Sequence, residues 1–100
     1  MERIELSYPA TEKLANKALA GVVGSGDLEA MFVPHDQNTL SIVIKTSVDG
    51  SKLLWTRFFE RLALLQRLPM GTLEINDFSA TPGVAKLRIE QVFEEAKHAK

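Results

Sequence analysis

The sequence of 100 residues contains no cysteine. This absence excludes disulfide bonds, thiolate metal ligands and a cysteine nucleophile. It also constrains acyl chemistry, because a thioester needs a sulfur atom. If this protein ever holds an acyl group as a thioester, the sulfur must come from an added group.

The chain also lacks an excess of charge of either sign. Twelve Lys and Arg residues stand against 13 Asp and Glu residues, for a net charge of -1, whereas a nucleic-acid footprint requires clustered basic residues. No apolar stretch approaches the ~20 residues that span a bilayer. No apolar segment follows the first five residues, so we expect no signal peptide and a cytoplasmic location. The length suffices for one domain over residues 1–100.

Several segments favour β-strands. Residues 3–8 alternate polar and apolar side chains up to Pro9, the pattern of a half-buried strand. Residues 28–33 and 40–46 also favour strands, the latter being rich in β-branched residues, and we expect these two to pair as an antiparallel hairpin. A further strand should run from Leu73 to near Phe78. Residues 18–23 fit either a buried strand or the end of a short helix capped by Thr11.

A first long helix is expected from about residue 51 to residue 67. Asp49 or Ser51 can cap its start, and Pro69 and Gly71 follow its end. At about 100° per residue, one broad apolar face is shared by six residues: Leu54, Trp55, Phe58, Phe59, Leu62 and Leu65.

A second helix is expected after Thr81 and Pro82, an N-cap residue followed by proline at the first helical position. Its buried face should comprise Ala85, Ile89, Val92, Phe93 and Ala96. The whole order of elements predicts an α+β fold of two layers, with a largely antiparallel sheet and two main helices packed on one face.

The most informative segment for chemistry is the run Gly24-Ser25-Gly26-Asp27. Glycine removes side-chain bulk and permits positive φ, so the Ser25 hydroxyl is expected to be exposed. Backbone N–H groups of such a loop can form an anion-binding concavity, which would suit a phosphodiester. Asp27 could orient a metal or a substrate during attachment, or simply terminate the turn.

By its pattern alone, a Gly-Ser-Gly-Asp run is most often just a turn between strands. It fits neither phosphate-loop template, because G-x-x-x-x-G-K-[ST] is absent and G-x-G-x-x-G lacks its third glycine, position 29 being Glu. A small nucleotide-binding enzyme that uses Gly24, Ser25 and Gly26 is therefore the least favoured hypothesis, since a credible acid–base pair is also missing.

The stretch G-V-V-G-S-G-D-L-E over residues 21–29 resembles the attachment loop of malonate decarboxylase acyl carrier proteins, the delta subunits. The likeness extends to the opening I-E-L-S-Y-P-A, to I-K-T-S-V-D in the middle, and to the late run that begins L-P-M-G-T-L-E-I-N-D-F-S-A-T-P-G. It therefore covers nearly the whole chain, in the order of that family.

This resemblance implies a single acyl carrier domain that is not an enzyme by itself. In the family, the serine of the G-S-G motif bears 2′-(5″-triphosphoribosyl)-3′-dephospho-coenzyme A through a phosphodiester. The matching residue is Ser25, with Gly24, Gly26 and Asp27 as a supporting loop. The implied cargo is acetyl and malonyl groups, held as thioesters on the thiol of this arm.

The partners implied by the resemblance are an acyltransferase (alpha) subunit, a pair of decarboxylase (beta and gamma) subunits, and the transferase, or holo-carrier synthase, that attaches the prosthetic group. Nucleic acid and membranes are not among them. A citrate lyase-type carrier subunit, which uses the same prosthetic group on a serine, is the nearest alternative, although its attachment loop resembles this sequence less well.

An unmodified scaffold module of a multi-subunit enzyme is the alternative from a different class. It would use Leu53 and Leu64, which lie off the main apolar stripe of the first helix and either form a docking surface or are buried by a loop. Trp55, Phe58 and Phe59 are expected to pack in the core rather than line a ligand pocket.

Four other polar residues are expected to be solvated. His35 and His98 are the only histidines, too few for a typical zinc site, so no metal site is predicted. Glu74 and Asp77 are carboxylates in or beside one strand, and we expect them at a solvated strand edge.

Overall fold

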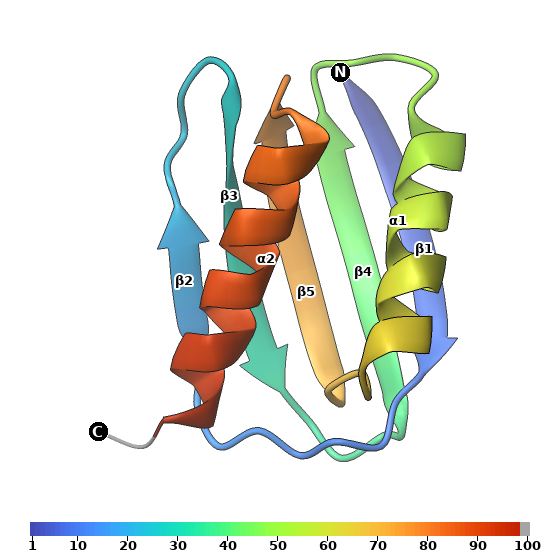
Figure 1. Ribbon diagram of the computed structural model, residues 1–100, viewed down its shortest axis with the longest axis vertical. Coiled ribbons are helices and arrows are strands. Elements are labelled where there is room, and N and C mark those ends of the chain that lie inside the picture. Colours follow the sequence, from blue (N-terminus) through green and yellow to red (C-terminus); the bar gives the residue numbers. More distant parts are fainter. Residues whose placement is uncertain (99–100) are drawn as a thin grey trace.

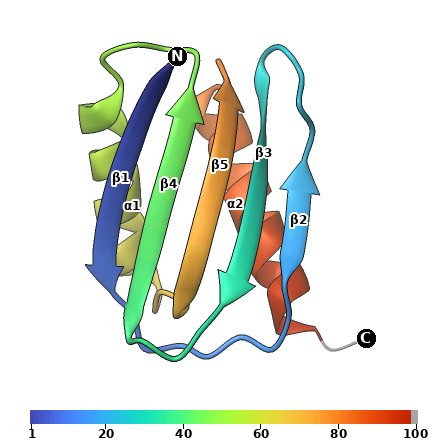
Figure 2. The same ribbon diagram turned by 180° about the vertical axis from the view of Figure 1, so that it is seen from behind.

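The alternation of side chains along the strands builds a sheet with one covered face and one open face. In the computed structural model, which describes residues 1–98, the strands are β1 (Glu2–Pro9), β2 (Ala18–Gly21), β3 (Asp27–Pro34), β4 (Thr39–Thr46) and β5 (Gly71–Phe78). Helices α1 (Lys52–Leu65) and α2 (Pro82–Lys97) both cover the same face (Figure 1). Seen from behind, the other face carries no helix (Figure 2). The predicted two-layer α+β fold is confirmed.

The strand order corrects one prediction. The order is β1-β4-β5-β3-β2, so residues 28–33 and 40–46 do not form a hairpin. Instead, β5 lies between them, antiparallel to β3 and parallel to β4. The connection over residues 35–38 is long enough for this, because it must cross two strand spacings of about 10 Å in total. Helix α1 supplies the crossover that a parallel β4–β5 pair requires.

The segment between β1 and β2 is extended rather than helical. Glu12 forms an isolated parallel bridge with Pro69, and Leu14 is buried. The Asn16 amide N–H donates to the carbonyl of Ala96 over 3.1 Å, which ties the segment to α2. The short helix considered for residues 11–19 is therefore wrong, and the strand reading holds for residues 18–21.

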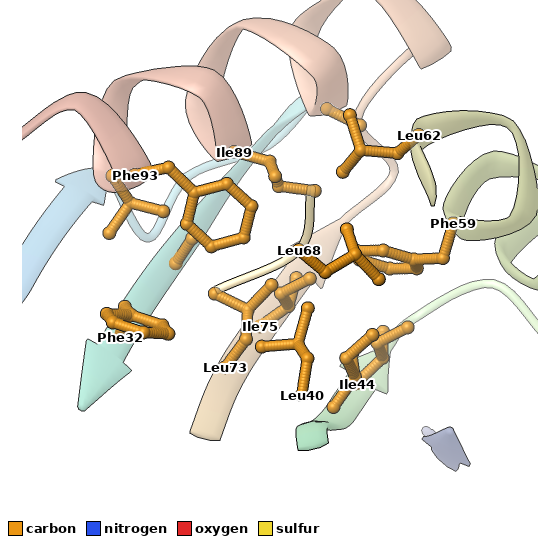
Figure 3. Close-up of a cluster of buried hydrophobic side chains, with 14 of the residues drawn as sticks. Phe32, Leu40, Ile44, Phe59, Leu62, Leu68, Leu73, Ile75, Ile89 and Phe93 are labelled. Atoms are coloured by element: carbon orange, nitrogen blue, oxygen red, sulfur yellow. The ribbon is translucent and has the colours of Figure 1, made fainter. Parts of the chain in front are cut away.

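Helix α2 follows its sequence pattern closely. The Thr81 hydroxyl accepts a hydrogen bond from the Val84 N–H over 3.2 Å, and Pro82 is the first helical residue. The buried residues are the five predicted ones: Ala85, Ile89, Val92, Phe93 and Ala96. In Figure 3 the Phe93 side chain lies next to Phe32 of β3, with ring centroids 5.6 Å apart in an edge-to-face pair. Burying one such side chain stabilises the fold by roughly 1.5–3 kcal/mol.

Helix α1 departs from its sequence pattern. Its buried residues are Trp55, Phe59 and Leu62, whereas Leu54 and Leu65 of the predicted apolar face are 68% and 72% exposed. Ser51 precedes the helix as expected, but its hydroxyl donates to the Val48 carbonyl instead of capping a helix N–H. The physical reason is that α1 lies over the β1 edge of the sheet (Figure 1), where only the stripe of Trp55, Phe59 and Leu62 is buried.

Among residues 1–98, no helix has the length and the apolar character needed to cross a membrane.

The core lies between the sheet and the two helices, where side chains such as Leu40, Ile44, Leu73 and Ile75 are shielded from solvent (Figure 3). The loops at the ends of the strands are thus held by a well-packed layer beneath the helices.

Candidate functional site

The loop between β2 and β3 presents Ser25 at the corner of a tight turn. The Asp27 N–H donates to the Gly24 carbonyl over 3.1 Å, which closes a four-residue β-turn. Gly26 has a φ of 78°, the positive value that the third position of a type II turn requires. Ser25 occupies the second position and is exposed, as the flanking glycines predict.

The surroundings of Ser25 leave room for a large substituent. A Cβ atom placed on Gly26 would have no heavy atom within 4 Å, and one placed on Gly24 would meet only a methyl group of Val22 at 3.9 Å. Val22 and Val23 are themselves 54% and 64% exposed. A group attached to the serine would therefore extend into open space.

The base of this loop, in contrast, is fixed by backbone contacts. The Gly26 N–H donates to the Phe78 carbonyl over 2.7 Å, and the Val22 N–H donates to the Leu28 carbonyl over 3.1 Å. Gly21 has a φ of 90°, and a Cβ there would collide with the Leu28 carbonyl. Because these N–H groups and that of Asp27 already bind carbonyls, they cannot contribute to the anion-binding concavity suggested by the sequence.

Asp27 anchors the loop to helix α2. Its two carboxylate oxygens accept from Arg88, with Nε–Oδ1 at 3.0 Å and Nη2–Oδ2 at 2.8 Å. The Leu28 N–H donates to Oδ1 over 2.7 Å. These hydrogen bonds, led by those from Arg88, lower the pKa of Asp27 below its ordinary value. The turn-terminating role suggested for Asp27 fits this geometry better than a metal-orienting one.

The pairing with Arg88 was missed by sequence reasoning. Sixty-one positions separate Asp27 and Arg88, and no local spacing links them. Within residues 1–98, no group of three or more His, Cys, Asp or Glu side chains could hold a metal ion. The loop therefore holds the Asp27 carboxylate, which is paired with Arg88, close in sequence to the exposed hydroxyl of Ser25.

Asp77 lies at the same end of the sheet and corrects another prediction. Its side chain is buried, with 4% exposure, rather than solvated. Oδ2 accepts from the Thr46 hydroxyl over 2.8 Å, and Oδ1 accepts from the Ala80 N–H over 3.0 Å. These bonds fix the turn from β5 to α2, next to the Phe78 carbonyl that holds Gly26. Glu74 is exposed, as predicted, but it lies on the central strand β5 and not at an edge of the sheet.

The remaining candidate residues lie away from this loop. His98 is exposed, as predicted, and pairs with Glu94 over 2.9 Å. His35 is half-buried after the far end of β3, where its Nδ1 accepts from the Gln37 N–H over 3.1 Å. Neither histidine joins a catalytic arrangement with Ser25.

The aromatic and leucine predictions for α1 have mixed outcomes. Trp55 and Phe59 are buried in the core and Phe58 is packed against it, as predicted. Trp55 and Phe58 also line a groove beside α1, which the prediction did not expect. Leu53 and Leu64 are 59% and 88% exposed, so the possibility that a loop buries them is wrong. The docking interpretation of these leucines is the one that the structure leaves open.

Comparison with known proteins identifies relatives along nearly the full chain. Residues 15–96 match the model of the family described as malonate decarboxylase delta subunit (MdcD). The malonate decarboxylase acyl carrier protein of Klebsiella pneumoniae is 57% identical over 99 residues, which cover 99% of this chain and 100% of that protein. The protein of the same name from Pseudomonas syringae pv. syringae (strain B728a) is 47% identical, with coverages of 98% and 99%.

A solved structure shares the fold. A chain in the crystal structure of a Pseudomonas malonate decarboxylase hetero-tetramer in complex with malonate superposes with a TM-score of 0.91 at 47% sequence identity. The match covers 96% of this chain and 99% of that chain. The relative with this fold is thus part of a multi-subunit enzyme.

Proposed function

The chain belongs to the malonate decarboxylase delta-subunit family of acyl carrier proteins, and from this premise we propose that Ser25 is the attachment point of its prosthetic group. A carrier of this family is a non-catalytic subunit of the decarboxylase. The single observation that supports Ser25 best is its exposed position at the corner of a turn whose base is fixed. Gly24, Gly26 and Asp27 serve the site by shaping and anchoring that turn.

The proposed group is 2′-(5″-triphosphoribosyl)-3′-dephospho-coenzyme A, joined to the Ser25 Oγ through a phosphodiester. The open space next to Gly24 and Gly26 supports a substituent on the serine between them. When attached, the group supplies the sulfhydryl that a chain without cysteine lacks, and a thioester carbonyl accepts electron density during decarboxylation better than a free carboxylate does. Oxyanion stabilisation in that reaction is assigned to the decarboxylase subunits rather than to this chain.

The loop positions Ser25 and takes no part in the reaction itself. The Asp27–Arg88 pair and the Gly26–Phe78 hydrogen bond hold the β3 side of the turn base, and the hydrogen bond from the Val22 N–H to the Leu28 carbonyl holds the β2 side. The serine corner therefore projects from a defined place on the domain. A tethered cargo anchored at such a point reaches the active sites of the complex at a high effective concentration.

The proposed partners are the acyltransferase (alpha) subunit, the decarboxylase (beta and gamma) subunits and the transferase that attaches the group. The hetero-tetrameric assembly of the Pseudomonas relative supports partners of this kind. A cytoplasmic location stays a prediction from the sequence.

Substitution of the serine tests the proposal. After co-expression with the attachment enzymes, we expect Ser25→Ala to lack the mass increase of the wild type and to support no malonate-dependent turnover, with an unchanged circular dichroism spectrum. Ser47→Ala is the matched control, because Ser47 is an exposed serine whose hydroxyl lies 3.2 Å from that of Ser79 at the same end of the sheet. A Ser25→Ala protein that still gains the mass, or that supports full turnover, would refute the assignment.

A further inference from the structure

Helix α1 has a second apolar face that the described part of the chain does not cover. The residues on it are leucines from both ends of the helix, with exposures of 59% for Leu53, 68% for Leu54, 88% for Leu64 and 72% for Leu65. At about 100° per residue, Leu54 and Leu65 flank the buried stripe of α1, and Leu53 and Leu64 lie farther round the helix. Single exposed leucines are normal, but several on one helix face indicate an interaction surface.

Leu54 and Leu64 of this face line a groove between α1 and the start of α2, which we call the α1 groove. It has a volume of about 590 Å³, and Leu54, Phe58 and Leu64 line it from α1, while Pro82 and Ala85 line it from α2. The groove is open and mainly apolar. Exposed apolar surface of this kind, rimmed by polar residues, marks a site of interaction with other molecules.

The charge of the α1 groove defines the chemistry of its occupant. Arg57 and Arg61 line it beside the leucines, and neither belongs to any of the four ion pairs within residues 1–98. The lining carboxylate of Asp77 is already bound to Thr46 and Ala80, and Glu60 is the other acidic residue of the lining. Arginine among apolar residues is typical of interface centres, and these two arginines complement carboxylates.

The α1 groove and the serine loop lie on opposite flanks of α2. Arg88 reaches from α2 to Asp27 beside β2 and β3, whereas Pro82 and Ala85 face the groove toward α1. Across the sheet, α1 comes first, α2 lies next to it, and the β2–β3 loop lies beyond α2 (Figure 1). A segment confined to the groove therefore leaves Ser25 uncovered.

We propose that the α1 groove docks an apolar, carboxylate-bearing segment of another subunit of the decarboxylase complex, and that Ser25 stays free on the other flank of α2 during docking. This inference rests on the proposed function, because it requires the partner subunits of that complex. It adds the surface that holds the carrier, as distinct from the residue that carries the arm.

The test is the affinity of the unmodified carrier for each purified partner subunit, measured by calorimetry. We expect Leu54→Ser/Leu64→Ser and, separately, Arg57→Glu/Arg61→Glu to weaken binding to one subunit by tenfold or more, as substitutions at interface centres do. The control for the leucines is Leu87→Ser on α2, a leucine 50% exposed outside the groove. The charge-matched control is Lys17→Glu/Lys45→Glu, whose residues are exposed outside the groove, and both controls should bind within about twofold of the wild type.

Three results would overturn the proposal. One is equal affinity of the groove variants and the controls for every subunit. Another is binding that appears only after modification of Ser25, because the arm rather than the groove would then make the contact. The third is a concentration-dependent dimer of the wild type that the leucine variant abolishes, which would make a second copy the occupant.

Failure of the docking proposal can be distinguished from failure of the proposed attachment at Ser25. Docking by the unmodified Ser25→Ala protein should equal that of the wild type, and the groove variants should still gain the mass of the prosthetic group. Melting curves of the groove variants serve as the folding check, and we expect them to match the wild type because the substituted side chains are exposed.

Discussion

Helices α1 and α2 lie on the same face of the same sheet, yet they relate to their sequences differently. In α2, all the residues predicted to be buried are buried. In α1, Leu54 and Leu65 carry the same apolar signal and are exposed. An apolar pattern therefore reveals which side chains favour burial, but not whether the burying surface belongs to the same chain. The α2 pattern is satisfied within the domain, and the surplus on α1 indicates a partner.

The largest effect that tests this comparison of α1 and α2 is a change in the free energy of unfolding. Phe93→Ala removes a ring that packs edge-to-face on Phe32, and we expect it to lower the free energy of unfolding by about 3–5 kcal/mol. Leu64→Ala, at 88% exposure, should change it by less than about 0.5 kcal/mol. Urea unfolding of both variants measures this difference. A comparable loss in Leu64→Ala would show that α1 buries this leucine in solution.

A smaller effect tests the start of α2. Thr81→Ala removes the hydroxyl that accepts from the Val84 N–H, and loss of such a cap costs about 1 kcal/mol. Thr81→Ser retains a capping oxygen and should lose only a few tenths of that amount. If the two variants have equal urea midpoints, the capping bond does not stabilise α2 as the structure indicates.

The next prediction concerns the serine loop. Asp27→Asn weakens the pairing with Arg88 while keeping the size of the side chain. We expect faster hydrogen exchange at the Gly26 amide and slower attachment of the prosthetic group, with little change in global unfolding. Glu29→Gln is a control that alters another carboxylate of β3 away from Arg88. Exchange at Gly26 that does not differ between the two variants would contradict the anchoring role of Asp27.

The smallest effect is a pH dependence of the same pair. The pKa of Asp27 is lowered in the folded protein, so the pair contributes its stability above the unfolded pKa of about 4. That contribution is lost as the pH falls through the lower folded pKa. As the pH falls below about 4, wild-type stability should therefore decline more than that of Asp27→Asn. Parallel stability curves for the two proteins in thermal melts would contradict this.

The parts of the fold that depend on local patterns could be predicted from the sequence. The β-branched run of β4 and the Thr81-Pro82 start of α2 are local signals, and so are the glycines that expose Ser25. The contacts of Asp27 and Asp77 could not be predicted, because their partners Arg88 and Thr46 are distant in sequence. The predicted hairpin of residues 28–33 and 40–46 failed for the same reason, since β5 inserts between these two strands.

The most direct test of the central claim is to locate the prosthetic group in the natively modified protein. Trypsin should release residues 18–45 as one peptide, because no Lys or Arg lies between Lys17 and Lys45. The account predicts that tandem mass spectrometry of this peptide finds the added mass on Ser25. Placement of the mass on Ser41 or in any other peptide, or a fully active complex whose carrier has no added mass, would contradict it.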